Sequence, residues 1–318
     1  MDSSTSEKRR PDEAPPPSEL IGVLEQGRRQ FLALVEHVRP ELHRYCTRMT
    51  GSAADGEDVV QETLARGYYE LSQMSTLPAL RPWLFRIAHN RAIDRWRHDR
   101  ARATEPLDAA AEVAGEAALE PDNALARQQA VQAAIGCFLA LAPAQRGCVI
   151  LKDVLDHSLE EIAAELELSV PAVKAALHRG RAALRQRVEV GPAAPVAAAR
   201  ATSAALRRYA SLFNAHDWDG VRGLLAEDVR LDLVAHRKAA GRREVGTYFA
   251  NYARVAGWQV QPGWFDGREV LAVRVVAGGP PRYFVELCWR DGQVVAIRDF
   301  RYVPYIAQDS AFALDAAA

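Results

Sequence analysis

Residues 158–187 combine helix-capping residues with a concentration of basic residues. Ser158 and Glu161, three positions apart, form the capping-box pattern that starts a helix. Pro171 stands where the first turn of a second helix is expected. That second helix carries five Lys or Arg residues and no Asp or Glu over residues 170–187. Because an acid-free basic stripe suits phosphate groups, this stretch predicts a helix-turn-helix whose second helix enters DNA.

The candidate DNA contacts of this hairpin lie on the second helix. Base edges are expected to be read from its N-terminal half, residues 171–178, because recognition helices insert that end into the groove. An ordinary hairpin with a solvated basic face is the alternative. The candidates are Pro171, Lys174, His178, Arg179 and Arg181.

An acidic face is predicted on an earlier helix. Ser52 and Asp55 form a capping pattern that opens the segment GEDVVQETLARGYYEL. Its apolar positions recur at helical spacing, so its polar side chains gather on another face. Such a face offers complementary charge to a basic partner, although a merely solvated face is an equal alternative. The face comprises Asp55, Asp58, Gln61 and Glu62.

The next helix, residues 81–102, is rich in arginine. Basic grooves of this kind hold the backbone of single-stranded nucleic acid. Its two tryptophans, Trp83 and Trp96, are interpreted as core residues rather than stacking platforms. The candidate strand contacts are Asn90, Arg91, Asp94, Arg95 and Arg97.

Composition limits the classes of function. The 318-residue chain has a net charge of −1, so DNA binding must come from local clusters. Its four cysteines are scattered without a C-x-x-C pair, which argues against a zinc site or a disulfide framework and suits a reducing, cytoplasmic location. There is no run of about 18 apolar residues that would cross a membrane. Residues 1–22 have the composition of a disordered tail and not of a signal peptide.

The chain divides by composition into two helical domains and a third, mixed domain. Residues 104–122 hold six acidic residues and no basic one, which predicts a flexible linker. A second, Pro/Ala-rich linker follows the helix-turn-helix. The predicted boundaries are a tail at 1–22, a helical domain at 23–102, a linker at 103–123, a helical domain at 124–190, a linker at 191–202, a third domain at 203–308 and a tail at 309–318.

The third domain is predicted to be an α+β cone. Helical segments precede a run of strands joined by the turn pairs Asp266-Gly267 and Asp291-Gly292. Cone folds open a pocket at one end of the sheet, where a buried Asp or His can act as a base. Catalysis, ligand sensing and purely structural regulation are all open. The residues that could line such a pocket are Asp232, His236, Tyr248, Trp264, Tyr283 and Asp299.

The order of DGEDVVQETLARGY, LRPWLFRIAHNRAIDRWR and the helix-turn-helix resembles an extracytoplasmic-function (ECF) sigma factor of bacterial RNA polymerase over residues 23–188. The resemblance implies two all-α sigma domains, regions 2 and 4. It implies that the acidic face binds the clamp helices of polymerase core, with the flap as a further part of the core partner. It also implies that Asn90 to Arg97 hold the melted −10 strand, that residues 72–80 shape a flipped-base pocket, and that the helix-turn-helix reads the −35 element. The acidic linker would then follow the RNA path, or act only as a tether.

One residue departs from the pattern of that family. Glu167 stands in the turn where a glycine is usual. If its backbone is left-handed, a non-glycine residue costs about 1 kcal/mol there. A rearranged turn, with a shifted recognition helix, is therefore an expectation to be checked.

The third domain resembles the SnoaL-like branch of the ketosteroid-isomerase-like folds over residues 203–305, on the pattern RRYASLFNAHDWDGVRGLLAEDVRLDL. Sigma factors with such a fused domain form groups in which the extension is thought to regulate the factor in cis. The tryptophan-proline linker and glycine-rich motif of the best-known group are missing from GPAAPVAAAR and VAHRKAAGRREV, so this chain would belong to another subgroup.

The sequence therefore predicts an alternative sigma factor that is not an enzyme and uses no cofactor or metal. Its expected partners are RNA polymerase core and promoter DNA, with a small-molecule ligand of the third domain left open. The competing hypothesis is a SnoaL-like enzyme or ligand sensor joined to a polymerase-independent helix-turn-helix regulator.

Overall fold

The computed structural model describes residues 26–27, 29–74, 76, 78–103, 136–190, 201–254, 257–275, 279–307 and 312–315. The predicted tail at 1–22 and nearly all of the linkers at 103–123 and 191–202 lie outside these residues. None of the helices that the structure describes is long and apolar enough to cross a membrane.

The longer helices described in the first domain are α2 (Arg39–Thr50), α3 (Ala53–Leu71) and α4 (Leu80–Ala103), and a helical stretch at residues 29–35 precedes them. Gly51 ends α2 with a φ of 90°, a left-handed conformation that favours glycine. Ser52 then caps α3 as predicted, its hydroxyl accepting the Asp55 N–H at 3.2 Å. Trp83 lies in the core, as expected, with 4% of its surface exposed.

The second domain consists of α6 (Pro143–Val149), the π-helical turn η1 (Ile150–Val154), α7 (Leu159–Leu166) and α8 (Val170–Val190). The capping box of Ser158 and Glu161 is confirmed, and α7 and α8 form the predicted helix-turn-helix. Glu167 is left-handed, with φ 54° and ψ 44°. The turn is closed with this backbone, because the Leu168 N–H donates to the Ala163 carbonyl at 2.9 Å. A shift of the recognition helix relative to the usual turn stays a prediction.

The two helical domains pack against each other around one continuous apolar core. Buried polar groups cross the junction as well. The guanidinium of Arg146, on α6, is buried and donates to the carbonyls of Met49 on α2, Leu139 and Leu141. Helix C-termini present unpaired carbonyls with partial negative charge, so an arginine is a suitable partner.

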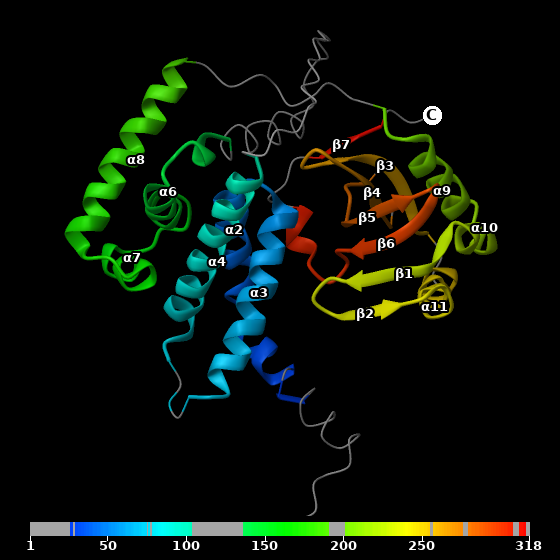
Figure 1. The fold of residues 1–318 in the computed structure, drawn as a ribbon, viewed down its shortest axis with the longest axis horizontal. Coiled ribbons are helices and arrows are strands. Elements are labelled where there is room, and N and C mark those ends of the chain that lie inside the picture. Colours follow the sequence, from blue (N-terminus) through cyan, green and yellow to red (C-terminus); the bar gives the residue numbers. More distant parts are fainter. Residues whose placement is uncertain are drawn as a thin grey trace, which may run out of the picture.

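The third domain has the predicted α+β fold. Three helices, α9 (Ala204–Asn214), α10 (Trp218–Gly223) and α11 (Arg242–Ala253), pack on a sheet with the order β2-β1-β6-β5-β4-β3-β7. In Figure 1 these helices lie on the side of the sheet away from the helical domains. The strands are β1 (Leu225–Leu233), β2 (Arg237–Ala240), β3 (Gln259–Phe265), β4 (Arg268–Arg274), β5 (Tyr283–Arg290), β6 (Gln293–Asp299) and β7 (Phe312–Leu314).

Two strands were not expected from the sequence. β2 pairs with β1, and β7 pairs with β3 through Gly263 and Leu314, so the sheet extends past residue 308 where a tail was predicted. Both are short edge strands. β2 forms a hairpin with the preceding strand β1, whereas β7 pairs with the much earlier strand β3, a contact that no local pattern indicates. The turns at Asp266-Gly267 and Asp291-Gly292 are as predicted, with positive φ at both residues of each pair.

The sheet domain packs against α2 and α3. The short helix η2 (Pro304–Ala307) lies between these helices and the sheet (Figure 1). One of its apolar clusters includes Ala53 and Ala54 from the start of α3, next to Phe265, Phe300 and Ile306. The first and third domains therefore share a packed interface.

Candidate nucleic-acid and protein interfaces

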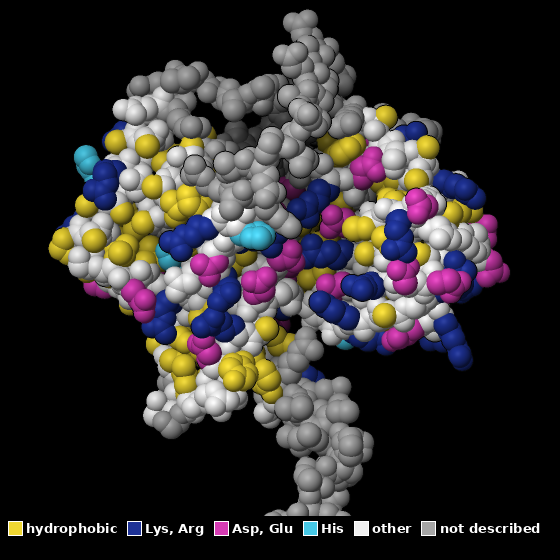
Figure 2. All heavy atoms as spheres, in the orientation of Figure 1, with side chains coloured by type: hydrophobic (Ala, Val, Ile, Leu, Met, Phe, Trp, Pro, Cys, Tyr) yellow, Lys and Arg dark blue, Asp and Glu magenta, His cyan; other side chains and the backbone are white. Residues whose placement is uncertain are grey.

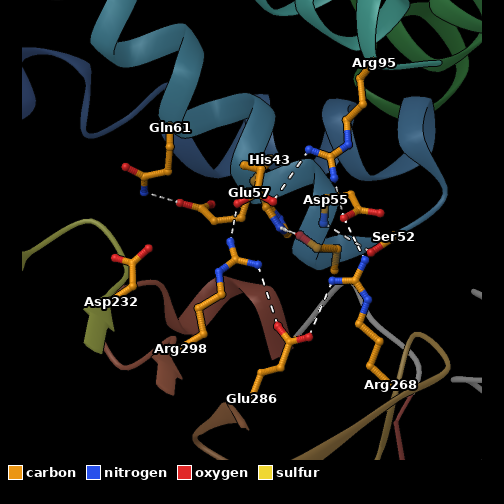
Figure 3. A network of polar contacts seen from close by, with 12 residues as sticks. His43, Ser52, Asp55, Glu57, Gln61, Arg95, Asp232, Arg268, Glu286 and Arg298 are labelled. Atoms are coloured by element: carbon orange, nitrogen blue, oxygen red, sulfur yellow. Dashed lines mark hydrogen bonds and ion pairs between the residues drawn. The ribbon is translucent and has the colours of Figure 1, made fainter. Parts of the chain in front are cut away.

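The acidic face of α3 meets arginines from the sheet domain (Figure 3). Asp55 forms an ion pair with Arg268 at 3.0 Å, and Asp58 forms one with Arg298. Gln61 and Glu62 follow on the same helix, and Glu62 is exposed. The structure thus brings the four predicted residues together along α3, and the sheet domain occupies the end that holds Asp55 and Asp58.

The two arginines are connected to each other by Glu286 on β5. Its carboxylate lies 3.6 Å from Arg268 and 3.8 Å from Arg298, between the two guanidinium groups. Charges therefore alternate across the seam, as Figure 2 shows on the visible face. Desolvation raises the pKa of the Asp58 carboxyl, while Arg298 and Arg95 act in the opposite direction.

A buried polar trio lies beside this network and was not predicted from the sequence. Glu57 is fully buried and accepts from Arg39 at 2.6 Å and from the hydroxyl of Tyr305 at 2.9 Å. Arg39 also donates to the Tyr305 oxygen at 2.6 Å. Burial is the main cause that raises the pKa of Tyr305, so its hydroxyl stays protonated and can donate. Tyr305 is 248 residues from Glu57 in the chain, so no local pattern indicates the contact.

Asp266 of the sheet domain contacts the N-terminus of α3. Its carboxylate accepts the Ala53 N–H at 2.6 Å, while Ser52 of the same helix accepts the N–H of Asp55. The first N–H groups of a helix lack partners within the helix and carry partial positive charge. The sheet domain therefore supplies a negatively charged cap to α3.

Four of the five predicted strand-binding residues line a groove of about 480 Å³ on α3 and α4: Asn90, Arg91, Asp94 and Arg97. Sequence reasoning missed several of its other lining residues, including Arg66, Glu70 and Arg86. The sequence could have indicated Arg66 and Glu70, because residues four positions apart on a helix can form an ion pair. They form one on α3 at 2.6 Å.

Arg95 does not join this groove. Its position is about 140° around α4 from Asn90, because successive helical residues are offset by about 100°. Its guanidinium instead lies 2.8 Å from Asp55 and 3.6 Å from Asp58. In this arrangement Arg95 therefore lies at the acidic face, and its contact with the DNA strand stays a prediction.

The candidate residues of the recognition helix α8 all lie on its exposed side: Pro171, Lys174, His178, Arg179 and Arg181. The opposite side, with Val173 and Leu177, is buried against the rest of the domain. Arg181 is held by Asp153, whose carboxylate accepts from the Arg181 Nε at 3.0 Å. The helix thus presents a basic surface while its apolar side anchors it.

The residues predicted to line a pocket in the third domain do not form one set. Tyr248, Tyr283 and Asp299 are buried together with Tyr252. Both Tyr248 and Tyr252 donate to Asp299, and the hydroxyls of Tyr252 and Tyr283 are 2.9 Å apart. Desolvation raises the pKa of the Asp299 carboxyl. These polar groups satisfy one another inside an aromatic core.

The other three residues of that set lie elsewhere. Asp232 lies 3.6 Å from Lys238 near the seam with α3, and the exposed His236 stacks on Tyr302 with ring centroids 4.2 Å apart. Trp264 is half-buried on β3, next to the edge strand β7. In this structure the six residues do not form one set. Asp232 and Asp299 lie on opposite faces of the sheet, because Asp299 pairs with Leu233, the residue next to Asp232. Within the described residues, no group of three or more His, Cys, Asp or Glu side chains is placed to hold a metal ion.

Comparisons with known proteins agree with this division of the chain. The family model of Sigma-70 region 2 matches residues 34–102, and that of Sigma-70, region 4 matches residues 132–184. The ECF RNA polymerase sigma factor SigG of Mycobacterium tuberculosis is 31% identical over 219 residues, which cover 61% of this chain and 59% of SigG. The match thus spans about three-fifths of that relative's length.

Two further proteins match parts of the chain. The ECF RNA polymerase sigma factor SigL of Mycobacterium tuberculosis is 35% identical over 157 residues, which cover 48% of this chain and 85% of SigL. An NTF-2 like protein of unknown function from Burkholderia xenovorans is 16% identical and covers 36% of this chain and 82% of its own, with a TM-score of 0.25.

Proposed function

Because this chain belongs to the family of ECF RNA polymerase sigma factors, we propose that it binds RNA polymerase core and directs it to promoters, under the control of its own third domain. Residues 23–102 then act as region 2, residues 124–190 as region 4 and residues 203–308, extended by β7, as the regulatory domain. The expected location is the cytoplasm, where polymerase works.

Core binding is assigned to Asp55, Asp58, Gln61 and Glu62. The observation that supports this assignment is their common face on α3, where arginine side chains of the sheet domain already dock. A surface that pairs with guanidinium groups in cis is suited to a basic partner in trans. Clamp helices and flap are the expected polymerase contacts.

Promoter binding is assigned to two other surfaces. Asn90, Arg91, Asp94 and Arg97, on the α3–α4 groove, would hold the melted −10 strand, because basic grooves track the backbone of single strands. The exposed side of α8 would read the −35 element in the major groove. Arg95 is assigned to the acidic face in the closed arrangement.

The third domain is proposed to regulate by covering part of the core-binding face. Asp55 and Asp58, with 19% and 32% of their side chains exposed, are held by Arg268 and Arg298, so a basic partner has to compete with these two arginines for them. Both the α3–α4 groove and the outer side of α8 remain exposed. The domain is proposed to act through this contact surface rather than through catalysis, which agrees with the mutual hydrogen bonding of its buried Tyr and Asp residues.

The proposal is tested with purified full-length protein, core polymerase and genomic promoter fragments. The protein should form a complex with core and start transcription at defined sites. Asn90→Ala and Lys174→Ala should reduce promoter-dependent transcription and leave core binding unchanged, since neither residue lies on the acidic face. Glu160→Ala, which changes an exposed carboxylate on α7, is the control. Failure to bind core, both as the natural protein and with Arg268 and Arg298 replaced by Glu, would refute the proposal.

A further inference from the structure

The third domain covers the core-binding face of α3 unequally. Asp55, at the start of the helix, has 19% of its side chain exposed and is enclosed by Arg268 and Arg95. Asp58, one turn later, has 32% exposed. Glu62, one further turn along, is exposed to solvent. The burial of α3 side chains by the third domain therefore decreases from Asp55 to Glu62. These seven residues correspond to about 10 Å along the helix.

A cleft marks the point at which the cover ends. It has a volume of about 530 Å³ and lies between the middle of α3 and the turn that joins β1 to β2. Asp58, Gln61 and Glu62 line it from α3 and Arg95 lines it from α4. The charged residues that line it from the sheet domain include Asp232, Arg237, Lys238 and Arg298. Figure 3 shows Gln61 and Asp232 facing each other across this space, next to the Arg298 contact.

The chemistry of the cleft indicates what kind of group could enter it. On the α3 side its charged residues are the carboxylates of Asp58 and Glu62, accompanied by the amide of Gln61. Asp58 already accepts a guanidinium group, that of Arg298, at the inner end of the cleft. An incoming arginine or lysine could thus contact Glu62 first and reach Asp58 next, without prior loss of the Arg298 pair.

We propose that this cleft is the entry site for polymerase core: basic groups of core engage Glu62 and Gln61 while the third domain is still docked, and then replace Arg298 on Asp58. The inference rests on the proposed function. In this stepwise exchange each lost pair is replaced as it breaks, so no step exposes the whole buried seam. Release of the third domain before core binds would instead require Arg268, Arg298 and Tyr305 to leave Asp55, Asp58 and Glu57 together, and would also open the apolar cluster that Ala53 shares with the sheet domain.

The two routes differ in their kinetics. Stepwise entry predicts a first, encounter phase whose rate rises in proportion to core concentration, followed by a slower phase in which Arg298 is replaced. Prior release predicts no such encounter phase, because all binding is then limited by the opening rate of the third domain. Stopped-flow measurement with fluorescently labelled core and the full-length chain distinguishes them.

Substitutions give a second readout. In the closed chain Glu62 provides the exposed negative charge of the cleft on α3, so Glu62→Gln should slow association about threefold or more at low salt. In the Arg298→Ala background Asp58 no longer has Arg298 as a partner, so its carboxylate also attracts the basic groups of core. Glu62→Gln should therefore slow association less in that background. Glu160→Gln, the same change of charge at an exposed site on α7, should have little effect in either background.

The outcomes separate the two proposals. An encounter phase proportional to core concentration, with a larger Glu62 effect in the natural chain than in Arg298→Ala, supports entry through the cleft. A single phase limited by opening of the third domain, or equal slowing by Glu62→Gln in both backgrounds, would overturn it and leave the sigma-factor assignment intact. Absence of core binding in every variant would overturn both.

Discussion

Glu167 shows how one residue can break a local rule while the fold is kept. A left-handed non-glycine residue costs about 1 kcal/mol, and the φ of 54° places Glu167 in that region. Its carboxylate lies 3.2 Å from Arg86 on α4, but both side chains are largely exposed, so this ion pair is worth about 0–1 kcal/mol. The pair can offset only part of the strain.

We therefore expect Glu167→Gly to raise the free energy of unfolding by up to about 1 kcal/mol. Glu167→Gln keeps the strained backbone and removes the ion pair, so it should lower stability slightly. Equilibrium urea unfolding of both variants checks this. A loss of stability in Glu167→Gly at least as large as in Glu167→Gln would mean that the Arg86 contact outweighs the strain.

His157 joins the two helical domains through charge. Its Nδ1 lies 2.8 Å from Glu165 and its Nε2 lies 3.0 Å from Glu41 of α2. Burial lowers the pKa of His157, but the hydrogen bonds to Glu165 and Glu41 raise it to about 9 overall. The imidazolium is therefore the form that holds the junction at neutral pH.

A pH dependence of stability follows from this shift. Because the folded pKa of about 9 exceeds the unfolded value of about 6.5, the contribution is fully present below pH 6.5 and is lost as the pH rises to about 9. Its size is on the order of 3 kcal/mol. Urea unfolding at pH 6.5 and 9 should show this loss, and His157→Gln should lose less over the same interval. Identical pH slopes for the two proteins would contradict the assignment.

At the scale of elements, α3 serves three surfaces along its length. Its first turn is capped by Asp266, its middle carries the acidic face, and Arg66 and Glu70 near its end line the groove beside α4. The helix itself was predictable, because its cap and apolar stripe are local. The contact of Asp266 with this helix was not predictable, because Asp266 lies 213 positions from Ala53. From the sequence, Asp266 is expected only to form a turn with Gly267.

The two Asp-Gly turns provide a matched test of this cap. Asp266 and Asp291 both precede a glycine and both have positive φ, but Asp266 accepts the Ala53 N–H. Asp266→Asn should weaken docking of the third domain and raise the affinity for core about two- to tenfold, since charged caps contribute about 0.5–2 kcal/mol. Asp291→Asn should leave the affinity unchanged. Equal effects would show that the Asp266 contact does not stabilise docking. Titration with labelled core polymerase measures both.

For the whole molecule, the sequence predicts the parts better than their arrangement. Regular helices, caps and turns depend on neighbouring residues, and they agree with the structure at Ser52, Ser158 and Asp291. The placement of the third domain depends on pairs such as Arg298 and Asp58, 240 residues apart. The candidate pocket residues do not form one set in this structure for the same reason, since the direction of each side chain is fixed by strand register.

The central claim is that the third domain covers the core-binding face of α3 through Arg268 and Arg298. Reversing both charges, Arg268→Glu with Arg298→Glu, places carboxylates opposite Asp55 and Asp58, where like charges repel. The matched control reverses Arg208 and Arg243, which are exposed on α9 and α11. Circular dichroism of both variants establishes that they remain folded.

The decisive measurement is the affinity of these full-length proteins for RNA polymerase core. We predict that the Arg268→Glu, Arg298→Glu protein binds core at least about tenfold more tightly than the natural chain, a difference of about 1.4 kcal/mol. The control should bind like the natural chain. A folded double variant with unchanged or weaker affinity would contradict the account.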